Sequence, residues 1–406
     1  MSARRIGRRA FLVTGAAALG GAAALGGREL LDGDEQTPRE VRAGGGTAGT
    51  ATVPFLGPRQ AGVGTPPQSF ATLVAFDLLD GVDRAALVRL MRVWTDDIER
   101  LTGGRPALSD TEPELATVPA RLTVTVGFGP GFLAAARRER LRPRWLAPLP
   151  PFPIDRLRDE YSGGDLVVQV CADDEITVAH AVRVLTRQAR TFALPRWVQR
   201  GFRNSPGTVP QGTTMRNLMG QVDGTRNLRP GTDDDRLIWI GEQGPEWLRG
   251  GTSMVVRRIA MNLDTWDELD RSAREQVIGR RLDTGAPLTG VAEHDEPDLT
   301  ATGPGGLSVI AKFAHIRRSR SDDPRQRFLR RSYNYDDPPP AGELSNSGLV
   351  FITFQADVEA QFTPIQRRLA ELDSLNDWTT PIGSAVFAVP RGCHDGEYLG
   401  QPLLED

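Results

Sequence analysis

Arg121-Leu122-Thr123-Val124-Thr125-Val126-Gly127-Phe128 alternates polar and apolar side chains. A period of two is typical of a strand with one buried face. Apolar runs and helical spacing around this stretch predict further strands at 69–79 and 165–172, and helices at 82–101, 132–140 and 177–191. We interpret the order as βαββαβ, with 132–140 as a minor helix, which is an α+β fold of the ferredoxin-like type.

The second half of the chain repeats this scheme. The pattern predicts strands at 253–263, 349–355 and 384–389, and helices at 266–280 and 359–372. A long irregular insert, 279–341, interrupts the repeat, and such inserts in compact domains are usually functional or disordered. We therefore expect duplicated ferredoxin-like domains with antiparallel sheets, at 67–208 and 209–406, preceded by a linker at 44–66.

Composition restricts the function only loosely. The 406 residues are 39% hydrophobic and 25% charged with a net charge of −3, so nothing favours a nucleic-acid partner. Nearly every basic residue is arginine, and one arginine therefore needs a motif before it indicates chemistry. In an exported protein Cys171 and Cys393 could form a disulfide, although the apolar run around Cys171 favours a buried free thiol.

The first residues resemble an export signal. Gly7-Arg8-Arg9-Ala10-Phe11-Leu12 opens an apolar stretch that continues to about Gly27. Paired arginines before a short apolar region are typical of the twin-arginine route, so residues 1–43 are interpreted as signal peptide and leader. The stretch is short and glycine-rich, which argues against a membrane span that persists in the mature protein. We expect an extracellular, cell-envelope or periplasmic location.

Three short segments carry the chemical information. The first is Gly220-Gln221-Val222-Asp223-Gly224-Thr225-Arg226-Asn227, where Asp-Gly by itself predicts only a tight turn. The second is Ala314-His315-Ile316-Arg317, and the third is Leu329-Arg330-Arg331-Ser332-Tyr333. The second and third both fall in the insert, which favours a functional insert.

A twin-arginine leader followed by these segments in this order resembles the dye-decolorizing peroxidases, in particular their exported A-type, deferrochelatase-like branch. The resemblance extends over the whole mature chain. It implies duplicated ferredoxin-like domains, one haem b per chain and a haem pocket in the C-terminal half. It also implies an enzyme that reduces hydrogen peroxide and oxidises an organic electron donor, such as a dye or a phenol.

The resemblance assigns the haem ligand and the acid–base group. His315 would be the axial ligand of the haem iron, since a neutral imidazole is a good donor whose second nitrogen can bond to a neighbour. His294, in the same insert, is its rival. Asp223 would lie on the distal side, where a carboxylate can take a proton from peroxide and return it to the leaving oxygen.

The remaining roles belong to the distal side and the haem edge. Arg330 would stabilise the charge that develops as the O–O bond breaks, although Arg331 is its immediate alternative. Gly224 would let the backbone pass close to the porphyrin. Three further residues would bind the cofactor or brace its pocket, with Arg226 reaching a propionate: Arg226, Asn227 and Ser332.

Other functions stay open from the sequence alone. The main alternative is a deferrochelatase, which frees iron from haem for iron uptake and would use the same pocket. Further readings are a haem-binding protein related to chlorite dismutases and a carrier without haem. Aromatic residues that could pass electrons to bulky donors are not assigned, and a homo-oligomer is left open.

Overall fold

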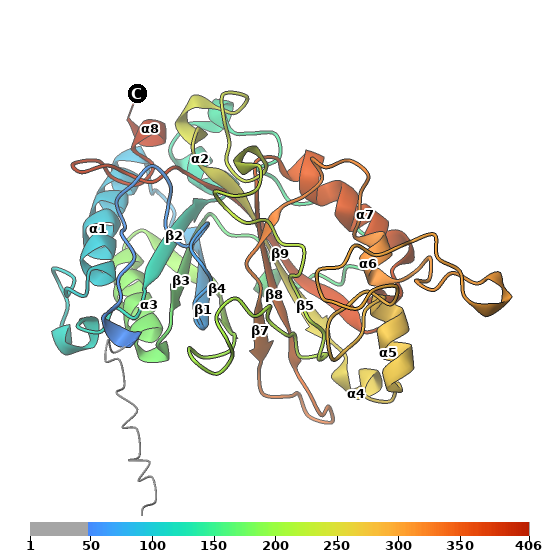
Figure 1. Ribbon diagram of the computed structural model, residues 1–406. Coiled ribbons are helices and arrows are strands. Elements are labelled where there is room, and N and C mark those ends of the chain that lie inside the picture. The colour runs from blue at the N-terminus through green and yellow to red at the C-terminus, as the bar shows by residue number, and fades with distance from the viewer. Residues whose placement is uncertain (1–47, 406) are drawn as a thin grey trace, which may run out of the picture. The chain divides into compact units, whose positions relative to one another are not determined.

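The computed structural model describes residues 48–405. Strands and helices follow one another in two successive sets (Figure 1). The first set, here the N-terminal half, comprises β1 (Phe70–Leu78), α1 (Arg84–Thr102), β2 (Thr123–Phe128), α2 (Pro130–Ala135), β3 (Leu166–Ala172), α3 (Glu175–Ala189) and β4 (Ala193–Phe202). The second set, the C-terminal half, comprises β5 (Thr252–Met261), α4 (Leu263–Trp266), α5 (Arg271–Ile278), α6 (His315–Arg318), β6 (Leu329–Arg330), β7 (Tyr333–Asp336), β8 (Ser347–Gln355), α7 (Thr363–Leu372), β9 (Thr379–Val389) and α8 (Gln401–Leu404).

The N-terminal half forms an antiparallel sheet in the order β2-β3-β1-β4, with α1 and α3 on one face (Figure 1). Asp83 caps the start of helix α1, because its side chain accepts a hydrogen bond from the Ala86 amide. Side chains at helical spacing along α1, including Leu87, Met91 and Trp94, are fully buried against the sheet. This is the packing that the sequence pattern predicts.

The C-terminal half forms a second antiparallel sheet, in which β5 lies between β8 and β9. The short strands β6 and β7 pair with β8. Single residue pairs connect the two sheets at their edges, Phe128 with Ala388 and Phe202 with Asn334. Apolar residues from both sheets fill the space between them, so the two halves share one core: Leu73, Ala75, Val167, Met254, Ile352, Phe354 and Phe387.

The expected α+β fold with duplicated βαββαβ sets is confirmed, and several of its details differ. The helix expected at 132–140 ends at Ala135, and the one expected at 359–372 begins with a π-helical turn at Val358–Phe362. Strand β4 escaped the sequence analysis because most of its side chains are exposed. The helix expected at 266–280 is two helices, α4 and α5, because Asp270 caps a new start by accepting a bond from the Ala273 amide. The insert at 279–341 is partly regular, since it supplies α6, β6 and β7.

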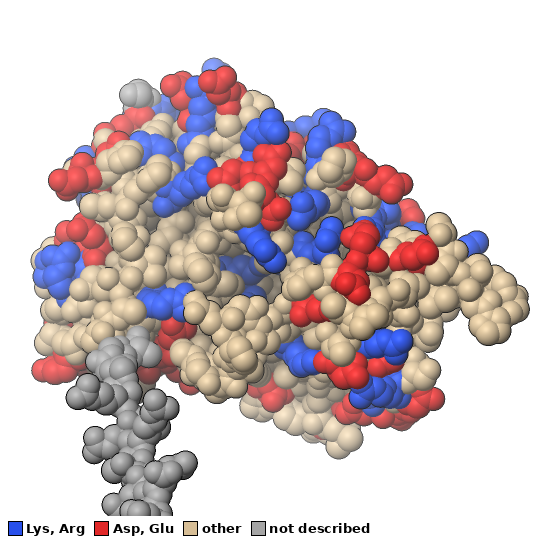
Figure 2. Space-filling model, viewed as in Figure 1, with Lys and Arg blue, Asp and Glu red and all other residues tan. Residues whose placement is uncertain are grey.

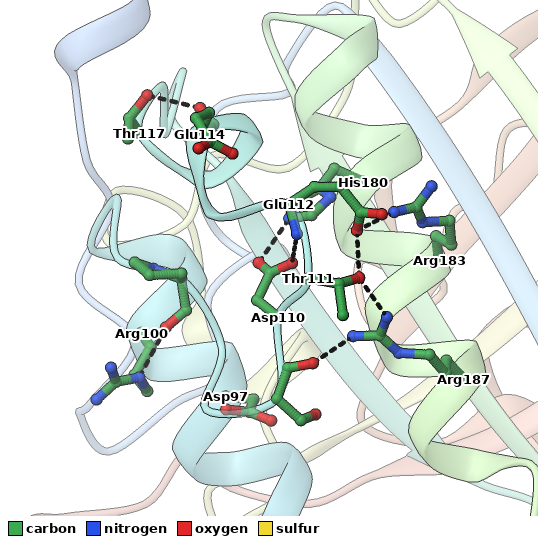
Figure 3. A network of polar contacts seen from close by, with 12 residues as sticks. Asp97, Arg100, Asp110, Thr111, Glu112, Glu114, Thr117, His180, Arg183 and Arg187 are labelled. Carbon is green, nitrogen blue, oxygen red and sulfur yellow. Dashed lines mark hydrogen bonds and ion pairs between the residues drawn. The ribbon is translucent and has the colours of Figure 1, made fainter.

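A polar network holds the connection between α1 and β2 against α3 (Figure 3). Its centre is a buried pair in which His180 Nε2 lies 2.8 Å from a carboxylate oxygen of Asp110. Arg187 on α3 donates to the Ser109 carbonyl and to the Thr111 hydroxyl. These contacts belong to the helix layer of the N-terminal half and brace it.

Both cysteines are free and buried, so the disulfide left open above does not form and the favoured free thiol at Cys171 is confirmed. Cys171 lies between the two sheets, whereas Cys393 packs in the cluster under α1. No helix within residues 48–405 is long and apolar enough to cross a bilayer. Basic and acidic side chains are interspersed over the face shown in Figure 2. The leader expected at 1–43 lies outside the described residues.

Candidate active site

A cavity of about 380 Å³ lies between the second sheet and the helices that cover it. The β5 and β8 side chains Ile259, Met261, Leu349 and Phe351 form the sheet wall. Helix residues form the facing wall, from α6 and α7: His315, Ile316, Ile365 and Leu369. The two walls are therefore largely apolar, with a few polar groups between them.

One contribution to the cavity comes from the N-terminal half. Ile154 lines the cavity, and the backbone after it bonds to β9 through the amides of Arg156 and Arg158. Buried Arg257 on β5 pairs with Asp155 and fixes the same segment. Most of the lining therefore comes from the C-terminal half, as expected, and the segment around Ile154 is the exception.

Asp223 and Arg330 meet inside the cavity. Asp223 follows a short hairpin in which Arg216 bridges to Val222, and its amide donates to the Met215 carbonyl. Arg330 lies on β6, and its Nη2 donates to Oδ1 of Asp223. The Arg330 guanidinium carbon also lies 5.0 Å from the ring centroid of Phe351, which orients the cation over the sheet wall.

Electrostatics keep the Asp223 carboxyl ionised. Burial raises its pKa, but the positive charge of Arg330 and hydrogen bonds from Asn217 and Arg330 outweigh burial. The net result is a pKa below the ordinary value. Asp223 is therefore a proton acceptor at neutral pH and in mild acid.

His315 enters the cavity from the helical wall. It is the first residue of α6, and its Nδ1 lies 2.6 Å from Oδ2 of Asp373. Asp373 is buried at the end of α7, where its other oxygen accepts from the Leu375 amide. Burial lowers the pKa of His315, and the Asp373 carboxylate more than compensates, so the pKa is raised. A metal ligand must be the neutral ring, and when the single proton of that ring lies on Nδ1 toward Asp373, Nε2 keeps its lone pair for the metal.

Arg331 and His294, the alternatives to Arg330 and His315, both lie outside the cavity. Arg331, the residue after β6, is buried outside the cavity, where it donates to the Thr65 carbonyl and to the Gln68 side chain. His294 is exposed and does not line the cavity. Of the alternatives that the sequence left open, Arg330 and His315 are the residues that reach the cavity.

Of the other predicted residues, two line the cavity and two lie outside its lining. Gly224 and Arg226 line the cavity, and Gly224 has φ +122°, a conformation that favours glycine. Asn227 clamps the Arg330 backbone, because its side chain accepts from the Arg330 amide and donates to the Arg330 carbonyl, both at 2.7 Å. Ser332 is buried outside the cavity, and among residues 48–405 its hydroxyl finds no hydrogen-bond partner.

Among the site residues that sequence reasoning missed are Asp373, Asn217 and Ile154. Asp373 reaches His315 across 58 positions, and nothing around it marks it as more than a helix end. Asn217 lies just before the Gly-x-x-Asp-Gly motif in the sequence, and asparagine is a residue type that commonly forms turns. Ile154 carries no recognisable signal, because only the docking of the two halves brings it to the cavity.

The cavity fits a haem group. Its two facing walls are apolar, as a flat macrocycle requires, and one imidazole nitrogen is available to a metal. Arg226, Arg280 and Arg320 line the cavity, where they can meet anionic substituents. The Arg330 Nε is buried and has no hydrogen-bond partner among the described residues. Fold and site together define an α+β haem-binding protein with an ionised carboxylate and an arginine in its pocket.

Comparison with known proteins gives the family. The family model for the N-terminal part of Dyp-type peroxidases matches residues 60–203, and the model for their C-terminal part matches residues 214–394. A dye-decolorizing peroxidase of Thermobifida fusca is 38% identical over 362 residues, 85% of this chain and 84% of that protein. A deferrochelatase of Escherichia coli K12 is 34% identical over 378 residues, 86% of this chain and 87% of that protein.

A solved structure agrees with the sequence relatives. The crystal structure of a DyP-type peroxidase from Cellulomonas bogoriensis superimposes with a TM-score of 0.87 and 64% sequence identity, covering 88% of this chain and 99% of that one. The chain belongs to the Dyp-type peroxidase family. It is a haem peroxidase, the enzyme class that its fold and cavity indicate.

Proposed function

We propose that Asp223 and Arg330 carry out the peroxide chemistry of this enzyme while His315 binds the iron of one haem b per chain. The observation that supports these roles is the convergence of three distant segments on one cavity, with His315 on the helical wall and the Asp223–Arg330 pair beside the sheet wall. Haem, when bound, supplies a redox-active iron that passes electrons from an organic donor to hydrogen peroxide.

Asp223 moves one proton within the peroxide molecule. Its carboxylate accepts the proton of one peroxide oxygen and delivers it to the other, which leaves as water when the O–O bond breaks. A depressed pKa keeps the carboxylate ready to accept that proton. Over a full cycle, two electrons from the donor and two protons convert one hydrogen peroxide into two waters.

Arg330 stabilises the charge that develops during this transfer. An arginine guanidinium is a permanent cation, so no proton transfer is needed before it can stabilise negative charge. Asn227 fixes the Arg330 backbone with two hydrogen bonds, and Phe351 lies under the guanidinium. A cation held in place before the reaction costs no reorganisation when charge appears.

On the other wall, His315 offers Nε2 to the iron while Asp373 holds Nδ1. The carboxylate partner fixes the ring orientation and strengthens imidazole as a donor. At the cavity, Arg226 and Arg320 both approach Glu296, which leaves an excess of positive charge for the haem propionates. Arg280, whose guanidinium donates to the Gly285 and Glu293 carbonyls, adds to that charge.

Stopped-flow mixing of the haem-loaded enzyme with hydrogen peroxide tests the distal roles. We expect Asp223→Asn to slow the reaction by about 100-fold or more, and Arg330→Leu to slow it by a factor on the order of 100. Both variants should retain the Soret band. Asp283→Asn removes an exposed carboxylate outside the cavity and should react at the wild-type rate. Wild-type rates in both distal variants would refute the assignment.

Titration of the haem-free protein with haem tests the ligand. We expect His315→Ala to lose stable haem binding, whereas His294→Ala, which changes the exposed histidine of the same insert, should bind as the wild type does. A His315→Ala protein with an unaltered Soret band would exclude His315 as the axial ligand.

We also propose export by the twin-arginine route, with the mature enzyme outside the cytoplasm. The support is the sequence Gly7-Arg8-Arg9-Ala10-Phe11-Leu12 and the apolar stretch behind it. Residues 1–43 fused to a folded reporter should direct it out of the cytoplasm, and changing Arg8 and Arg9 together to lysine should retain it inside. Export of the lysine variant at the normal level would contradict the proposal.

Deferrochelation is the second candidate, favoured by the 34% identity to a deferrochelatase over most of both chains. Such an activity would release iron and leave the tetrapyrrole intact, so protoporphyrin would accumulate. Fluorescence of protoporphyrin after incubation of the protein with haem and a reductant measures this directly. Peroxide turnover without protoporphyrin would leave the peroxidase reaction as the sole activity.

A further inference from the structure

Asn217 forms the turn that leads into Asp223. Its backbone amide donates to the Gln221 carbonyl at 3.0 Å, and its carbonyl accepts from the Gly220 amide at 2.9 Å. Its side-chain oxygen accepts from the amides of Met219 at 3.1 Å and Gln221 at 3.2 Å. Asn217 therefore holds the hairpin closed from both its backbone and its side chain.

The same side chain reaches the carboxylate. With its oxygen held by two backbone amides, the Asn217 side chain has one orientation, and its Nδ2 donates to Oδ2 of Asp223 at 3.3 Å. The other oxygen, Oδ1, accepts from Arg330. Each oxygen of Asp223 thus has its own donor, one neutral and one charged, so the plane of the carboxylate is fixed.

We propose that Asn217 is a positioning residue for the peroxidase reaction, which presents the Asp223 carboxylate in its proton-accepting form by holding Oδ2. This inference rests on the function proposed above for Asp223. It adds a side chain of the cavity lining whose effect on the reaction is exerted through the carboxylate of Asp223.

The effect of removing Asn217 follows from the charges around Asp223. Arg330 from β6 favours the ionised carboxylate, and Arg203, just after β4, adds a more distant positive charge. His315 faces the same cavity from α6, and in the haem-loaded protein its Nε2 is committed to the iron. These groups stay in a variant at Asn217, whereas one hydrogen bond to the ionised form is lost. The pKa of Asp223 should then rise, and the acid limit of the reaction should move to higher pH.

Two substitutions and one control separate positioning from turn stability. Asn217→Ala removes the donor and the turn contacts together. Asn217→Asp keeps an oxygen for the Met219 and Gln221 amides but replaces the donor with a second carboxylate. Arg216→Gln is the control, because Arg216 braces the same hairpin through backbone carbonyls of Gly220, Leu282 and Asp283 and does not bond to Asp223.

Two measurements on the haem-loaded proteins follow the protonation of Asp223. The first is the pH dependence of the rate of reaction with hydrogen peroxide. The second is the pH dependence of equilibrium cyanide binding, read from the Soret shift, because hydrogen cyanide must also give up its proton to a base in the pocket. In Asn217→Ala we expect both acid midpoints to rise by about one pH unit, so that the rate and the cyanide affinity fall about tenfold at pH values below the midpoint. In Asn217→Asp the midpoints should rise further, because a second negative charge beside Asp223 disfavours its ionised form.

The outcomes separate this inference from the proposed function. If Asp223→Asn abolishes the acid transition and both Asn217 variants keep the wild-type midpoint, Asn217 does not position Asp223, although the role of Asp223 stands. If Asp223→Asn leaves the transition in place, the proposed function itself fails. A shift of equal size in Arg216→Gln would assign the effect to the hairpin and overturn the inference.

Discussion

At the scale of single residues, the site depends on pairs that the chain brings together from far apart. His315 owes its orientation to Asp373, and Asp223 owes its ionised state to Arg330. In both pairs, burial by itself opposes the charged form, and an opposite charge together with hydrogen bonds to the charged form outweighs burial. The chemistry of each functional group is therefore set by one partner more than by its own type.

The first prediction concerns the His315 partner. Asp373→Asn removes the negative charge behind the imidazole, so His315 becomes a weaker donor and the reduction potential of the bound haem should rise. Spectroelectrochemical titration measures that potential. Asp377→Asn, which changes an exposed carboxylate four residues further on, should leave it unaltered. Equal potentials in wild type and Asp373→Asn would show that the contact does not tune the iron.

At the scale of elements, an ion pair holds the short segment that follows the last strand. Between β9 and α8, Arg391 forms two bonds with Glu397, at 2.8 and 3.0 Å, and Glu397 also accepts from the His394 amide. The bonds from Arg391 and then from the His394 amide lower the pKa of Glu397 to about 2. The pair closes the turn between Cys393 and Tyr398, which are both buried in the core cluster that includes α1.

A pH-dependent stability follows from that pKa. Because the folded pKa of Glu397 lies below its usual 4.5, the stabilisation is present above pH 4.5 and disappears as the pH falls toward 2. Glu397→Gln should lower the free energy of unfolding by about 1 kcal/mol at neutral pH, since the pair is partly exposed and screened. Denaturant titrations between pH 7 and 3 should show the difference shrinking below pH 4.5. A difference that stays constant over this range would contradict the prediction.

At the scale of the whole molecule, the two halves are locked by buried arginine as well as by apolar packing. Arg258 on β5 stacks between the rings of Tyr161 and Tyr335, at 4.3 and 4.1 Å. It also donates to Gln199 of the N-terminal half and to Asp337 of the C-terminal half. The Arg258 guanidinium thus forms hydrogen bonds with both halves of the molecule.

Removing that connection should weaken the docking of the two halves. We expect Arg258→Met to lower the free energy of unfolding by about 2 kcal/mol, because stacking with two rings and a partly buried ion pair are lost together. Chemical denaturation followed by tryptophan fluorescence measures this. Arg236→Met, at an exposed ion pair, should unfold at the wild-type denaturant concentration. Similar midpoints for Arg258→Met and the wild type would contradict the role of Arg258.

The sequence by itself determined the elements whose signal is local. Alternation marked β2, helical spacing marked α1, and three short motifs placed Asp223, His315 and Arg330 in the order typical of the family. These signals survive in the linear chain because they arise from neighbours within a few positions.

Only the tertiary structure decided which residues meet. It separated Arg330 in the cavity from Arg331 outside it, brought Asp373 to His315, and carried Ile154 from the first half into the second. The physical reason is that such contacts depend on how sheets and helices dock, and packing across long sequence separations leaves no periodic trace in the residues that take part.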